Sequence, residues 1–98
     1  MIYLDELAEA IRRAVPPEAL PDGDTAALFR VYAVLVLAKG EEVTRADVHN
    51  AWVAWMAGQD GNHESLVPFR DLDAETQAED SPYVVAIRAV AHGLPDES

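Results

Sequence analysis

Two histidines and two tryptophans lie close together in the sequence, at His49, Trp52, Trp55 and His63. Indole rings offer large flat faces on which a planar ligand can stack. Imidazole rings add hydrogen-bonding groups that titrate near neutral pH. This part of the chain therefore predicts stacking and hydrogen bonding to a planar molecule, if these side chains are accessible.

Each of these side chains also has a structural interpretation. Trp52 and Trp55 share one stripe of a predicted helix, which is more often a core face than a binding surface. His49 at the edge of that stripe is more often a hydrogen-bonded core histidine than a ligand. His63, in a polar loop, is equally suited to capping the loop through backbone bonds and to facing a bound molecule. Arg30, the one charge within an apolar helix, either reaches out to solvent or binds an anion.

Other chemistry finds little support in the sequence. The histidines at 49, 63 and 92 lack metal-ligand spacing, and the chain has no cysteine. Ser65 follows His63 and Glu64, but no glycine pair brackets it as in a nucleophile elbow. Glycine-rich phosphate loops are also absent. We therefore expect a protein that is not an enzyme and that uses no metal and no cofactor.

Composition and charge limit the partners. A chain of 98 residues is one domain, and its net charge of −11 repels phosphate backbones, so we expect no DNA or RNA partner. The N-terminal residues lack the basic region of a signal peptide. The longest apolar run, 26–38, contains Arg30 and is too short to span a bilayer. The sequence predicts no membrane partner and a cytoplasmic location.

The elements that must position these residues are helices. Amphipathic spacing predicts one over 4–15, ended by Pro16 and Pro17. Two further helices are expected at 25–39, with Gly40 as a left-handed stop, and at 44–57, with Thr44 opening a capping box. A short helix is expected from Asp71 or Asp73 to Ala78. The last is expected at 81–92, with Ser81 as the cap and Gly93, Leu94 and Pro95 as the end, before a frayed tail at 96–98. The expected fold is all-α: a small bundle of about four helices around the central apolar helix 25–39, with an irregular loop at 58–72.

The central helix is apolar on nearly all sides, which predicts that other elements cover most of it. Its run VYAVLVL (31–37) also has strand propensity, but about fifteen residues without a breaker favour a helix. The apolar excess of this helix further predicts a homo-oligomer.

The motif VHNAW at 48–52, then HESLVPFRDL at 63–72 and the acidic ETQAED at 75–80, resembles the ryanodine-receptor repeat domain. That family has a helix with H-E-x-W, a variable loop, H-P-x-L-V-P-F-D-E-L, a charged stretch and a closing helix. The resemblance covers about 47–91. Asn50 departs from the family's glutamate, and Arg70-Asp71 replaces its acidic pair. The whole is similar to small proteins of actinobacterial phages, with a helix pair at 1–40 preceding a motif region at 44–93 in one domain, 1–98.

This resemblance implies a small non-enzymatic domain that recognises a nucleotide-derived molecule, in a phage protein that would sequester a host immune signal in the host cytoplasm. The pocket that it implies is formed by His49, Trp52, His63, Leu66, Pro68 and Phe69. An anionic ligand also needs a local cation in so acidic a protein, so we add Arg45, Arg70 or Arg88 as phosphate partners. The alternative is a helical protein–protein interaction module without a small-molecule ligand, in which the tryptophan stripe and the LVPF loop are core or interface.

Overall fold

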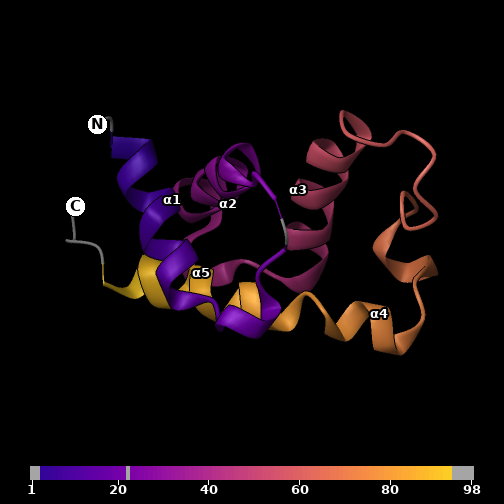
Figure 1. Ribbon diagram of the computed structural model, residues 1–98. Helices are drawn as coiled ribbons and strands as arrows, with labels where there is room; N and C mark the ends of the chain where they lie inside the picture. Colours follow the sequence, from indigo (N-terminus) through magenta and orange to yellow (C-terminus); the bar gives the residue numbers. More distant parts are fainter. Residues whose placement is uncertain (1–2, 22, 94–98) are drawn as a thin grey trace.

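The helices of the protein begin and end close to the positions that the sequence predicts. The computed structural model describes residues 3–21 and 23–93 (Figure 1). Within them lie α1 (Tyr3–Ala14), α2 (Ala26–Lys39), α3 (Arg45–Ala57), the short α4 (Ala74–Ala78) and α5 (Ser81–His92), with 3₁₀ turns η1 (Pro17–Ala19), η2 (Gly40–Glu42) and η3 (Phe69–Asp71). No strand occurs in these described ranges, so the all-α prediction is confirmed. The predicted helix-ending residues Leu94 and Pro95 and the tail 96–98 lie outside them.

The central position of α2 follows from its apolar sequence. Leu28, Phe29 and Ala33 are buried, and α2 packs against α1, α3 and α5. Asp24 accepts a hydrogen bond from the backbone N–H of Ala26 at 3.1 Å and so starts the helix. Gly40 ends it with a φ of 59°, the left-handed conformation that glycine adopts without steric strain.

One face of α2 is not covered. Val34 and Leu37 are spaced three residues apart, so they lie on the same side of the helix, and they are 49% and 53% exposed. The prediction that other elements cover the central helix therefore holds for the sides that meet α1, α3 and α5 only. The side of α2 that carries Val34 and Leu37 stays uncovered.

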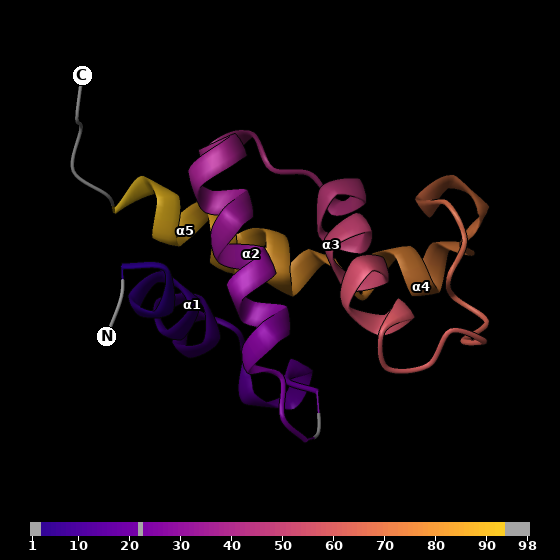
Figure 2. The same ribbon diagram turned by 90° about the horizontal axis from the view of Figure 1, so that it is seen from above.

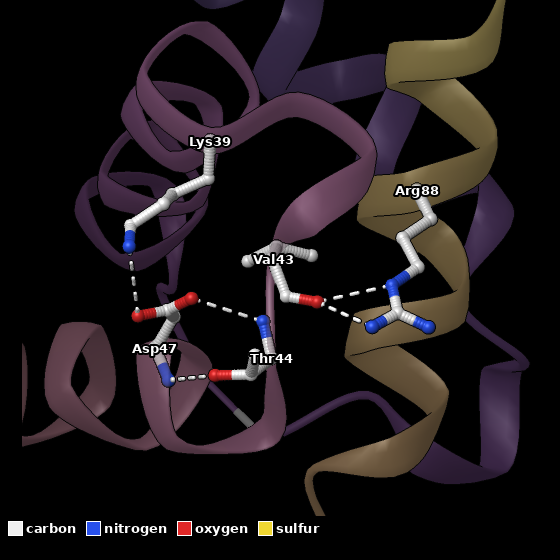
Figure 3. Close-up of polar contacts among 5 residues, drawn as sticks. All are labelled: Lys39, Val43, Thr44, Asp47 and Arg88. Atoms are coloured by element: carbon white, nitrogen blue, oxygen red, sulfur yellow. Dashed lines mark hydrogen bonds and ion pairs between the residues drawn. The ribbon is translucent and has the colours of Figure 1, made fainter.

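A capping box fixes the start of α3, as its sequence predicts (Figure 3). Thr44 Oγ1 accepts a hydrogen bond from the backbone N–H of Asp47 at 3.2 Å, and Asp47 Oδ2 accepts one from the N–H of Thr44 at 2.9 Å. Just before the cap, the carbonyl oxygen of Val43 accepts two hydrogen bonds from the Arg88 guanidinium, at 3.0 and 2.7 Å. The start of α3 is thereby tied to α5.

Ser81 was expected to cap α5, and this expectation is wrong by one residue. Ser81 is the first residue of the helix, and Asp80 occupies the N-cap position with φ −81° and ψ −14° and no side-chain capping bond. Because this backbone conformation is helical, the Asp80 carboxylate is not directed to the first N–H groups as a usual cap would be. Asp73, in contrast, caps α4 by accepting from the N–H of Thr76 at 2.8 Å.

Helix α5 joins the two ends of the molecule. It packs against α1, α2 and α3, and Figures 1 and 2 show it passing beneath α2 and beside α1. The loop after α3 and the short α4 form the end of the molecule opposite α1 (Figure 2). The loop thus returns the chain past α3 to the start of α5. None of the helices in the described ranges is long and apolar enough to span a membrane.

Candidate functional site

A cavity of about 480 Å³ lies where η1, α2, α3, the loop after α3, α4 and the start of α5 meet. This volume falls within the range of small-molecule sites. Five of its lining residues carry aromatic rings: Tyr32, His49, Trp52, His63 and Tyr83. Three others carry carboxylates: Glu18, Glu79 and Asp80. We refer to this space, with these eight residues as its defining walls, as the aromatic cavity.

His49 contributes both to the cavity wall and to the loop. Its side chain is 3% exposed, and Nε2 lies 2.6 Å from the carbonyl oxygen of Val67. A carbonyl oxygen only accepts, so Nε2 carries the hydrogen, and in the neutral ring Nδ1 is then an acceptor. The ring stacks on Trp52 with centroids 5.8 Å apart and an interplanar angle of 23°. His49 is therefore a hydrogen-bonded, nearly buried histidine that still borders the cavity.

His63 caps the loop, one of the two roles that its sequence left open, and it also borders the cavity. Its Nδ1 accepts a hydrogen bond from the backbone N–H of Ser65 at 3.0 Å, which caps the loop. Its ring meets Trp52 edge to face, with centroids 5.0 Å apart. The same ring lines the aromatic cavity. Trp52 thus contacts both histidines: it stacks on the His49 ring and meets the His63 ring edge to face. All three predicted residues come together at the cavity.

The other predicted site residues lie elsewhere. Phe69 packs beside His49, with centroids 6.1 Å apart, and the Arg45 guanidinium carbon lies 5.7 Å from the centre of the Phe69 ring. Neither of them lines the cavity. Leu66, Pro68 and Arg70 are also absent from its lining, and Arg70 is exposed on η3. The LVPF segment (66–69) therefore contacts His49 through the Val67 carbonyl oxygen and the Phe69 ring, and it does not line the cavity.

Two tyrosines that the sequence did not single out for the site also line the cavity. Tyr32 on α2 and Tyr83 on α5 have ring centroids 5.4 Å apart. The Tyr83 hydroxyl donates to the carbonyl oxygen of Ala19. Tyr32 is 2% exposed, and among the described residues its hydroxyl has no hydrogen-bond partner. In that same part of the chain no solvent-sealed side-chain oxygen lacks a partner, so the Tyr32 hydroxyl borders open space.

Asp80 is a third residue that the sequence did not single out for the site. Its partly buried carboxylate accepts no hydrogen bond within the described ranges. Burial raises the pKa of Asp80 to about 6, and the neighbouring Glu79 raises it further, while His49 and Arg45 oppose this shift. Burial also raises the pKa of Tyr83, and the nearby Asp80 adds to that effect. A carboxylate with these surroundings is poised to gain from a positively charged or hydrogen-donating partner.

A second hollow, lined in part by Asp5, Arg30 and Trp55, accounts for two residues that the sequence left undecided. Arg30 Nε donates to Asp5 Oδ1 at 2.6 Å, and this hydrogen bond and charge raise the pKa of Arg30. Arg30 is therefore an exposed ion-pair partner of α1. Trp55 packs against the core from this side and does not reach the aromatic cavity.

Metal binding has no support in the geometry. The described residues contain no group of three or more histidine, cysteine or carboxylate side chains that could hold a metal ion. The aromatic cavity is also too large for a bare ion, since a bound metal needs several ligands at about 2 to 2.6 Å.

The comparisons with known proteins give one match. The model of the family described as "Domain of unknown function (DUF7701)" matches residues 2–92. No curated protein and no solved structure matches the chain.

Proposed function

The chain belongs to the DUF7701 family, and we propose that it is a small non-enzymatic domain that binds a planar, nucleotide-derived molecule in the aromatic cavity. The observation that carries this proposal is the Tyr32 hydroxyl. It belongs to a side chain that is 2% exposed, and it borders the cavity without a partner in the described chain. Because no sealed side-chain oxygen in the described chain lacks a partner, this hydroxyl keeps access to the open space of the cavity, where a ligand can hydrogen-bond to it in place of water.

The ring chemistry of the cavity supports a flat ligand. Trp52, Tyr32 and Tyr83 present aromatic surface from three different helices, α3, α2 and α5. Aromatic walls bind planar rings through large contact area and through stacking or edge contacts. Rings on separate rigid helices keep their geometry better than rings on a loop. The cavity is therefore pre-formed on its three helical sides.

The two histidines support binding more than catalysis. His49 Nε2 is engaged by the Val67 carbonyl and His63 Nδ1 by the Ser65 N–H, so each ring has one nitrogen committed to holding the loop. A general acid or base must instead exchange protons with a reacting group within hydrogen-bond reach. We therefore propose that the histidines shape the cavity and contact its ligand without transforming it.

The charge of the cavity decides which part of a nucleotide would enter it. Three carboxylates line it, and among the described lining residues there is no lysine or arginine. A phosphate group inside would face these acids without a compensating cation. The proposal therefore puts the base inside and leaves any phosphate outside, where Arg45 lies beside Phe69. The resemblance to ryanodine-receptor repeats and the phage setting stay predictions.

The test is ligand-induced thermal stabilisation, with adenosine, AMP and ADP-ribose as probes. A ligand at about a hundred times its dissociation constant adds about 2.7 kcal/mol to the free energy of unfolding. Tyr32→Phe removes only the unpartnered hydroxyl and should weaken binding about tenfold. Tyr3→Phe, at an exposed position of α1, is the matched control and should leave binding unchanged. If no probe stabilises the protein, or if both variants behave alike, the proposed function is wrong.

A second candidate is a protein-interaction module that self-associates through α2. The observation that favours it is the exposed pair Val34 and Leu37 on one side of this apolar helix. Sedimentation equilibrium would show a homo-oligomer, and Val34→Lys with Leu37→Lys should convert it to monomer. A wild-type monomer across the micromolar range contradicts this candidate. The two candidates use different surfaces, so each can be tested separately.

A further inference from the structure

Building on the proposed ligand-binding role of the aromatic cavity, we propose that the group it receives is a planar organic cation, such as an amidinium, a guanidinium or a protonated nitrogen ring, held by Asp80 beneath Tyr32. This inference names the ligand class of the site. It does not depend on the ligand being nucleotide-derived.

The charge of the lining is the first argument. Glu18 comes from η1, and the adjacent residues Glu79 and Asp80 lie between α4 and α5, so the fold brings carboxylates from two distant parts of the chain to one space. The described part of that lining holds no lysine or arginine to balance them, and its basic side chains are the histidines His49 and His63. The nearest arginine that acts on Asp80 is Arg45, which lies against Phe69 outside the cavity. A cation entering the cavity would meet three carboxylates, of which Asp80 is offset only in part by His49 and Arg45.

The unused hydrogen-bonding capacity of Asp80 is the second argument. The aspartates at 24, 47 and 73 each accept a hydrogen bond from a backbone N–H at a helix start. Asp80 stands at such a position too, yet its carboxylate accepts no bond in the described chain. Burial raises its pKa to about 6, which shows that the carboxylate is held in a poorly solvating environment. An unpaired, partly buried carboxylate costs stability, and a cationic donor would relieve that cost.

The Tyr32 side chain adds a hydrogen-bonding argument to the argument from charge, because it lines the same cavity. Tyr32 is almost fully buried, lines the cavity and lacks a hydrogen-bond partner among the described residues. Burial raises its pKa, so the hydroxyl keeps its proton and is able both to donate and to accept. An N–H group of a planar cation can donate to its oxygen while another N–H group donates to Asp80.

The aromatic rings fit a cation as well as they fit a flat shape. The face of an indole or phenol carries negative electrostatic potential and attracts cations lying within about 6 Å of its centre. Trp52, Tyr32 and Tyr83 supply three such rings around the carboxylates. An inorganic ion would leave most of the 480 Å³ empty, whereas an organic cation occupies more of it and contacts the rings. The carboxylates therefore favour a positively charged ligand, and the rings favour a flat one.

Two sources share this chemistry: a free small molecule and an arginine side chain of a partner protein. The experiment uses calorimetric titration with three probes of nearly equal shape, namely benzamidinium (cationic), benzamide (neutral) and benzoate (anionic), and a Gly-Arg-Gly amide peptide. We expect benzamidinium to bind at least about tenfold more tightly than benzamide, and benzoate not to bind. Tighter binding of the peptide identifies a partner's arginine as the source, and tighter binding of benzamidinium identifies a free molecule.

Asp80→Asn removes the charge and keeps the shape of the side chain. It should weaken benzamidinium binding about tenfold or more, which corresponds to about 1.4 kcal/mol, and leave benzamide binding unchanged. Asp71→Asn makes the same chemical change at an exposed position outside the cavity and should have no effect. Circular dichroism of both variants confirms that they are folded.

The outcomes separate this inference from the proposed function. Equal affinity for benzamidinium and benzamide, unaffected by Asp80→Asn, overturns the cation inference while the cavity remains a binding site. Binding of adenosine without binding of any cationic probe also overturns the cation inference and leaves the cavity as a binding site. If no probe of either kind binds, and Tyr32→Phe changes nothing, both proposals fail.

Discussion

The Tyr83 hydroxyl donates a hydrogen bond to the carbonyl oxygen of Ala19, a residue 64 positions earlier in the chain. This bond ties η1, the turn between α1 and α2, to the first turn of α5. The ring of Tyr83 meanwhile packs against Tyr32 and Phe29, with centroids 5.4 and 6.4 Å away. One side chain therefore joins the core to the aromatic cavity and holds two of its walls together.

Tyr83→Phe tests this link. The ring is kept, so packing is nearly unchanged, but the Ala19 carbonyl loses its donor. We expect a loss of about 1 kcal/mol in the free energy of unfolding, measured by urea denaturation. Tyr3→Phe, at an exposed site, is the control and should change stability by less than about 0.5 kcal/mol. Equal effects of the two changes would mean that the bond to Ala19 contributes nothing.

Arg88→Lys tests how α5 holds the start of α3. The guanidinium donates from two nitrogens to the Val43 carbonyl (Figure 3), and a lysine ammonium cannot reproduce this paired geometry. We expect a loss of about 1 kcal/mol on urea denaturation, with both charge and much of the side-chain length retained. Arg12→Lys on the exposed side of α1 should be neutral, and a comparable loss there would contradict the assignment to Val43.

His49→Phe tests the anchoring of the loop after α3. Phenylalanine keeps a ring against Trp52 but leaves the Val67 carbonyl without its donor. We expect a loss of about 1–3 kcal/mol, because the bond is partly buried, and faster amide hydrogen exchange at residues 63–69. His92→Phe, at an exposed ring near Glu41, should leave exchange in this loop unchanged. Unaltered exchange in His49→Phe would show that the loop holds its shape by other contacts.

Local signals in the sequence predict the helices well. The capping box of Thr44, the glycine stop at Gly40 and the cap at Asp73 all act through residues within a few positions of one another. Such interactions are fully encoded in short windows, so periodicity and cap chemistry recover the helix bounds to within a residue or two. The one misplaced cap, Ser81, stands next to Asp80, whose helical backbone conformation no local pattern reveals.

The site was predictable only in part, because it is assembled from distant segments. His49, Trp52 and His63 are close in sequence and meet in the cavity, so a local motif finds them. Tyr32 and Asp80 reach the same space only because α5 returns beneath α2 and α3. A contact of this kind follows from tertiary packing, which hydrophobic spacing constrains but does not specify. The acidic character of the cavity was hidden for the same reason, because Glu18 on η1 meets the neighbours Glu79 and Asp80 between α4 and α5 only in the folded chain.

Asp80→Asn tests the electrostatic cost of the cavity. Burial raises the pKa of Asp80 from 3.8 to about 6, so the folded protein binds a proton more tightly there than the unfolded chain does. The free energy of unfolding that the protonated Asp80 carboxyl contributes is therefore fully present below about pH 4 and is lost as pH rises to about 6. His49, Glu79 and Arg45, which act on the same carboxylate, are present in both proteins, so the difference between wild type and variant isolates Asp80.

We expect Asp80→Asn to be more stable than wild type at pH 7 by about 1–3 kcal/mol, since about 1.4 kcal/mol corresponds to one pKa unit. The advantage should vanish by pH 4, where Asp80 is protonated in wild type. Urea denaturation from pH 4 to pH 8 measures it, with Asp71→Asn as the exposed control. A gain in stability together with a loss of cation binding would be the signature of a residue retained for its ligand. A variant that is less stable at pH 7 would instead show that the carboxylate holds the fold together.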